Sequence, residues 1–160
     1  MTMKRIALVF VLATVFAAAP LSSSAPVAAA AETQVSAAAA GVFPDGATFG
    51  GIPLQGSTFG IGVVVYPDGT ATGDFEIVLA GTSAVGQPQD ITLVGKVNAG
   101  TANPDGSVSF SGTAALDMGD GSLPVSVPFA AVVTTGGLQL TIGTTVLPTQ
   151  TLGAGDIFIG

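Results

Sequence analysis

Alternation of apolar and polar residues with a period of two constrains this chain more than any other feature of its sequence. Between residues 107 and 118, every second position from Val108 to Met118 is apolar or glycine, and those between are mostly serine, threonine or aspartate. Successive side chains of a β-strand point to opposite faces, so a strand with one buried face has this period. The stretch therefore predicts a half-buried β-strand.

The same pattern recurs along most of the chain after residue 42, where no segment has helical periodicity. It predicts about eight strands, at residues 47–54, 59–65, 71–79, 91–97, 107–118, 123–133, 138–146 and 149–159.

The segments between these strands are short and have the composition of tight turns. Pro-Asp-Gly occurs three times, at residues 44–46, 67–69 and 104–106. Proline presets φ, aspartate accepts a local backbone hydrogen bond, and glycine tolerates the exit geometry of a turn. Short links join antiparallel neighbours, so the sequence predicts a meander.

The predicted strands are longer than the usual five or six residues, which is more typical of barrels than of sandwiches. Closure also removes exposed sheet edges, which this chain could hardly protect with lysine because it has so few. We therefore expect an all-β fold: a single antiparallel meander of about eight strands, closed into a barrel or barrel-like roll. A two-sheet β-sandwich is the alternative.

The N-terminus has the pattern of a bacterial export signal. Lys4 and Arg5 precede an apolar run over residues 6–19, which ends at Pro20. As a helix this run spans roughly 21 Å, short of the ~30 Å hydrocarbon core of a membrane. We expect a cleaved signal peptide over residues 1–31, a flexible lead-in over 32–41 and one β-domain over 42–160. The mature protein is then secreted, periplasmic or on the cell surface.

The composition excludes several kinds of chemistry. The chain has no histidine and no cysteine, and Lys96 is its only basic residue beyond the leader. Thiol and histidine catalysis, disulfides and the usual zinc, haem and iron–sulfur sites are therefore excluded. A formal net charge of −7 also excludes nucleic acid as a partner. We expect no enzymatic activity and no cofactor.

The acidic residues offer weak alternatives to that expectation. Asp74 and Glu76 lie two apart on one strand, about 7 Å from each other, but on the face assigned to solvent, which does not raise a carboxyl pKa. We expect them to be surface carboxylates, with Lys96 as a solvated partner of Asp90 or Glu76. Asp117 and Asp120 are weak calcium candidates, although turn formation explains both.

The predicted interior contains small residues among large ones. Gly73, Gly95 and Gly112 share a face with the apolar side chains. They could open a cavity for an apolar ligand, lined by four phenylalanines: Phe59, Phe75, Phe110 and Phe129. Alternatively they mark tight bends where the sheet coils and closes.

Three functions follow from these observations. The first is an exported, non-enzymatic barrel with a structural, surface or matrix role, whose weakly charged threonine-, serine- and glycine-rich outer face is open to self-association or to a polysaccharide. The second is the same barrel carrying an apolar small molecule. The third is a small outer-membrane barrel, but such a barrel needs a polar lumen and aromatic girdles, whereas this chain has one tyrosine and no tryptophan. We therefore do not expect membrane insertion.

Overall fold

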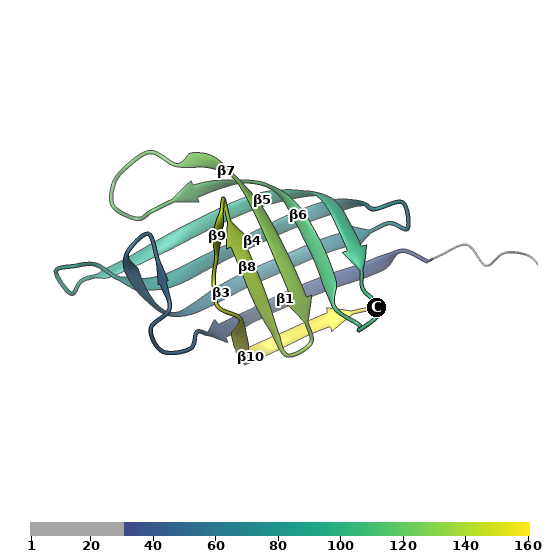
Figure 1. Ribbon diagram of the computed structural model, residues 1–160, viewed down its shortest axis with the longest axis horizontal. Helices are drawn as coiled ribbons and strands as arrows, with labels where there is room; N and C mark the ends of the chain where they lie inside the picture. The colour runs from purple at the N-terminus through teal and green to yellow at the C-terminus, as the bar shows by residue number, and fades with distance from the viewer. Residues whose placement is uncertain (1–30) are drawn as a thin grey trace, which may run out of the picture.

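A computed structural model describes residues 31–160, which form one antiparallel sheet of ten strands (Figure 1). Within these residues, no helix is long and apolar enough to cross a membrane. The strands are β1 (Thr33–Val42), β2 (Thr48–Phe49), β3 (Ile52–Val65), β4 (Thr70–Thr82), β5 (Pro88–Ala102), β6 (Val108–Asp117), β7 (Val125–Thr134), β8 (Gly137–Ile142), β9 (Thr145–Val146) and β10 (Gln150–Ile159).

The hydrogen bonding of the sheet runs round in a ring. From β3 to β8 each strand pairs with the next in sequence, β8 pairs with β10, and β10 pairs with β1. The ring closes because β1 also pairs with β3 along its whole length. The predicted all-β meander with a barrel-like closure is thus confirmed. Two of the ten strands, β2 and β9, are only two residues long.

The predicted flexible lead-in over residues 32–41 is wrong, because the chain forms β1 there. Gln34 and Gly160 exchange both backbone hydrogen bonds, so even-numbered residues of β1 bond to β10 and odd-numbered ones to β3. The run Ala37–Ala40 has little strand propensity of its own. Backbone pairing on both edges decides its conformation instead.

Two strand boundaries also differ from the prediction. Residues 47–54 do not form a separate strand: β2 turns back at Gly50 and Gly51 and pairs with the start of β3. Residues 138–146 contain a hairpin, since β8 ends at Ile142 and β9 pairs back onto it. Gly143 makes this turn possible with a φ of 60°, which glycine adopts without strain.

The apolar faces predicted from the alternation form the core. Phe75, Ile77 and Leu93, for example, are completely buried. The exceptions among the large apolar side chains are Leu123, Val125 and Val146, predicted to be buried, which are 87%, 54% and 61% exposed. Leu123 and Val125 lie where the chain is only entering the ring, because β7 begins at Val125. Val146 lies on β9, beyond the hairpin turn at Gly143 that the alternation did not predict.

Gly73 and Gly112 lie where neighbouring backbones approach closely. A Cβ added to Gly73 would lie 2.0 Å from the carbonyl oxygen of Gly62, and one added to Gly112 would lie 1.9 Å from that of Lys96. The strand register shifts at Gly73 in the β4–β5 pair, and beside Val97, the partner of Gly112, in the β5–β6 pair. These two glycines therefore mark bends of the sheet.

A pair of glycine-to-alanine substitutions tests this assignment. Gly112→Ala should lower the free energy of unfolding by about 1–3 kcal/mol, because the new methyl group meets backbone that cannot yield. Gly60→Ala, where an added Cβ has no neighbour within 4 Å, should raise it by about 0.5–1 kcal/mol. Urea unfolding of both variants measures the difference, and equal effects would contradict the close approach at Gly112.

Candidate functional site

Three of the four phenylalanines predicted to line a pocket pack directly against one another. The rings of Phe75 and Phe129 are stacked with centroids 5.2 Å apart, and Phe110 meets both edge-on at 5.7 and 6.4 Å. Phe59 is also buried. Centroid separations of 4.5–7 Å are those of aromatic rings in contact. The space among the three rings is therefore filled by the rings themselves.

Gly95 belongs to the same packing. A Cβ added there would lie 2.6 Å from the ring of Phe129. The missing side chain of Gly95 is replaced by this aromatic ring, so this glycine does not open a cavity. With the bends at Gly73 and Gly112, each of the three glycines predicted to face inward has a structural explanation.

Asp74 and Glu76 lie on the outer face of β4, as predicted, and both are exposed. The partner of Lys96 on β5 is Asp74, which stands directly opposite it on β4 and forms an ion pair with it. The predicted partners, Asp90 and Glu76, are wrong. The Lys96 and Asp74 side chains are 81% and 70% exposed. An ion pair this exposed adds little stability and leaves no desolvated acid for catalysis.

The calcium candidates are engaged in local turns. Asp117 accepts a hydrogen bond from the backbone of Gly119 at 2.8 Å, and Asp120 accepts one from that of Ser122 at 2.9 Å. Hydrogen bonding by Ser122, from its side chain and then its backbone, holds the pKa of Asp120 below the usual 3.8. Within residues 31–160, no three acidic residues lie close enough together to hold a metal ion.

Two of the Pro-Asp-Gly turns close in the same way. The carboxylate of Asp68 accepts hydrogen bonds from the hydroxyl and backbone of Thr70, and that of Asp105 from the hydroxyl and backbone of Ser107. These bonds, the hydroxyl one first, lower the pKa of both carboxyls below 3.8. The role predicted for aspartate in these turns is confirmed.

One buried polar contact was not predicted. Gln150 is 1% exposed, and its Oε1 accepts a hydrogen bond from the hydroxyl of Ser57 on β3. Its side chain lies against Gly41 of β1, where an added Cβ would be 2.0 Å from Oε1. Gln150 thus connects β10 to β3 underneath β1, at the start of β10, where its backbone also pairs with Leu138 of β8. No local motif signals this contact, because it joins residues 93 positions apart.

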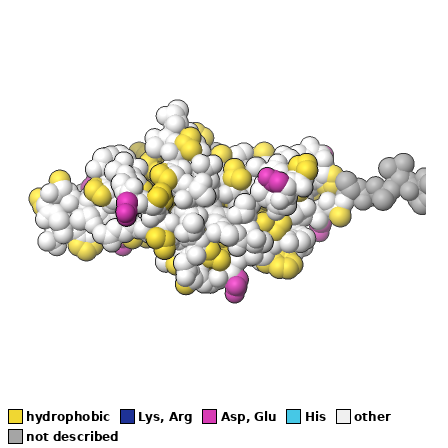
Figure 2. All heavy atoms as spheres, turned by 60° about the horizontal axis from the view of Figure 1, so that its bottom comes forward, with side chains coloured by type: hydrophobic (Ala, Val, Ile, Leu, Met, Phe, Trp, Pro, Cys, Tyr) yellow, Lys and Arg dark blue, Asp and Glu magenta, His cyan; other side chains and the backbone are white. Residues whose placement is uncertain are grey.

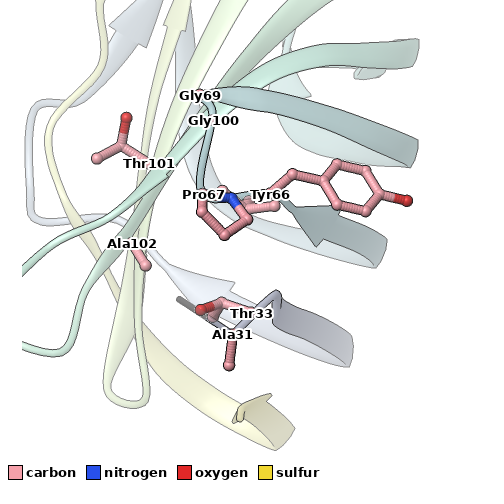
Figure 3. A pocket seen from close by; sticks show the side chains of 9 residues that line it. Ala31, Thr33, Tyr66, Pro67, Gly69, Gly100, Thr101 and Ala102 are labelled. Atoms are coloured by element: carbon pink, nitrogen blue, oxygen red, sulfur yellow. The ribbon is translucent and has the colours of Figure 1, made fainter. Parts of the chain in front are cut away.

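A small pocket opens at the end of the ring where β1 begins (Figure 3). Its volume is about 250 Å³, and it lies between Thr33, the turn after β3 and the end of β5. No charged side chain is among its nine lining residues. The ring of Tyr66 points away from the other side chains of the pocket in Figure 3. The pocket therefore offers no acid, base or nucleophile beyond threonine hydroxyls.

A groove crosses the outer face of β1 and β3. It consists of two depressions of about 410 and 240 Å³, which both include Ala38 in their lining. Residues of adjacent strands stand opposite one another across it, in the rows Asp156–Ala38–Gly60–Glu76 and Phe158–Ser36–Gly62–Asp74. Ser36, Ala38 and Gly60 form part of its floor. Asp156 and Phe158 on β10 form one wall, and Glu76 on β4 forms the other. Three strand spacings separate the walls by roughly 14 Å.

The groove is one of the hollows that the outer sheet face offers to a partner. Phe158 on its β10 wall is 62% exposed. Seen from the side of β10, the surface consists mostly of uncharged polar groups and backbone, with separated carboxylates and no basic side chain in view (Figure 2). The sequence predicted this weakly charged face but not that it is hollowed, since the hollow depends on which strands become neighbours.

Comparisons of the chain with models of known protein families, with curated proteins and with solved structures find no match.

Truncation of a central ring tests whether the interior is packed. Phe110→Ala should lower the free energy of unfolding by about 3–5 kcal/mol, because Phe110 is 2% exposed and contacts two other rings. Asp74→Ala, on the outer face, should change it by less than about 0.5 kcal/mol. A loss below 1 kcal/mol for Phe110→Ala in urea unfolding would show that the interior is open at this point.

Proposed function

We propose that this chain is an exported, non-enzymatic β-domain with a structural role at the cell surface or in a secreted matrix, and that it acts through the outside of its ring. The observation that carries the proposal is the packed interior. Phe75, Phe110 and Phe129 occupy the centre with their own rings, which leaves the outer face as the surface available to partners.

The distribution of ionisable groups supports a role without catalysis. The paired carboxylates of β4 are exposed, and Asp74 is engaged by Lys96. A general acid needs a raised pKa, which burial or a neighbouring negative charge supplies. Exposure on a strand face does not provide the desolvation that a catalytic acid needs.

The two other functions predicted from the sequence have less support. An apolar cargo would need space among the phenylalanines, and their rings are in contact. An outer-membrane barrel has apolar residues outside and polar ones inside. In this ring the charged Asp74, Glu76 and Lys96 face outward and most of the inward residues are apolar, which weighs against a membrane barrel.

Export is supported by the sequence alone. The basic pair Lys4–Arg5 and the apolar run over residues 6–19 have the order and length of a signal peptide. These residues lie outside the part that the structure describes.

The proposal predicts how the natural protein behaves on fractionation. Native mass spectrometry of the protein from the medium, the periplasm and the detergent-extracted membrane of its own cells should find a chain that begins near residue 31 or 32, without added mass. Its source should be a fraction obtained without detergent.

Two results would contradict the proposal. A reproducible added mass of a few hundred daltons would favour the ligand-carrying barrel. Recovery only from detergent-extracted membrane would favour the outer-membrane barrel. The intact mass also identifies the cleavage site in each case.

A further inference from the structure

We infer that the groove over β1 and β3 is the docking surface for an extended, positively charged segment of a partner protein. The inference rests on the proposed function and deepens it, because it names the kind of partner that the outer face of the ring takes.

The first observation is that two outward-facing glycines of β3, Gly60 in the groove floor and Gly62 beside the groove, have no explanation within this chain. Gly60 and Gly62 lie inside β3, without the positive φ that favours glycine, and a Cβ added to either would have no neighbour within 4 Å. In contrast, Gly73, Gly95 and Gly112 each lie where a side chain would collide with another part of the chain. Glycine weakens a strand, and inside one it often marks a site where another backbone or a ligand approaches closely. We take Gly60, in the floor of the groove, to mark the approach of a neighbour from outside the chain.

The second observation is the charge of the walls. Asp156 on β10 and Glu76 on β4 end the same row, on opposite sides of Ala38 and Gly60. Within residues 31–160, neither carboxylate forms an ion pair, because the single lysine is engaged with Asp74. In a bound extended segment, basic side chains that point to one side would meet Asp156, and those that point to the other side would meet Glu76.

The shape of the groove suits an extended chain. Its floor follows two neighbouring strands, and its walls stand roughly 14 Å apart, which accommodates one backbone with side chains directed to both sides. The exposed ring of Phe158 on one wall offers a surface for the stem or the cation of an arginine or lysine.

A second copy of the same chain does not fit this surface. Residues 31–160 contain one lysine and ten acidic residues, a formal net charge of −9. Two such molecules repel each other, and the lysine that a second copy could offer is already paired. A basic partner is the complement of this surface.

The test measures binding of a defined cationic peptide to the folded domain. The probe is a fluorescein-labelled peptide of about ten residues in which pairs of lysines alternate with pairs of threonines, so that lysines point to both sides of the extended peptide. The neutral control has glutamine in place of lysine. We expect fluorescence anisotropy to show binding of the lysine peptide alone. The binding should weaken steeply with added salt, because exposed charges are screened.

Substitutions locate the site. Gly60→Val puts a side chain into the open space above the floor and should weaken binding roughly tenfold or more by steric exclusion. The matched control is Ala115→Val on the outer face of β6, two strands beyond Glu76, which should leave binding unchanged. Glu76→Gln and Asp156→Asn should each weaken binding about fivefold, which corresponds to about 1 kcal/mol, whereas Asp45→Asn in an exposed turn should not. Thermal unfolding confirms that each variant is folded.

Three results would overturn the inference. The first is equal binding of the neutral peptide, and the second is unchanged binding by Gly60→Val together with the two wall variants. The third is that a soluble neutral β-glucan, and not the lysine peptide, binds in a manner sensitive to Gly60→Val, which would make the occupant a polysaccharide. Each of these results would overturn only the inference that the partner is a basic protein segment. The proposed function is tested separately, by fractionation and by the intact mass of the natural protein.

Discussion

Closure of the ring by β1 is the constraint on which the rest of the structure depends. β1 takes up hydrogen-bonding groups of β3 on one side and of β10 on the other, so neither of those edges is left open there. An open edge would expose unpaired backbone groups in a chain with one lysine beyond its leader to guard them. The contact of Gln150 with Ser57, beneath Gly41, reinforces the same junction from inside.

Closure also decides which surface can carry function. It brings Phe75, Phe110 and Phe129 together from three strands and fills the centre of the ring. It places the small outward residues of β1 beside the glycines of β3, between the walls formed by β10 and β4. The packed interior and the groove outside are therefore two consequences of one arrangement of strands. Because the interior is filled and the groove lies outside, the outer face is the surface that a partner can reach.

The alternation of residues was sufficient to predict the strand class, the meander and the buried faces, because burial of one sheet face imposes a period of two. The alternation failed to predict the strands whose position depends on backbone pairing with neighbouring strands and not on the pattern of residues. The alanines of β1 have no pattern to detect, and the hairpin at Gly143 interrupts a stretch that still alternates. The four phenylalanines were correctly placed inside, but whether their rings touch or leave space depends on distances that no single strand encodes. The groove and the Gln150 contact join strands far apart in sequence and could not be predicted at all.

A proline substitution in β1 tests the closure most directly. In Ala37→Pro the strand loses a backbone N–H that bonds to β3, so the account predicts a loss of at least about 2 kcal/mol in the free energy of unfolding. Ala84→Pro is the matched control, because Ala84 is the second residue of the exposed turn that Ser83 and Gly86 close, a position that suits proline. It should leave the stability unchanged. Equal stability of the two variants in urea unfolding would mean that residues 33–42 do not close the ring, and would contradict the account.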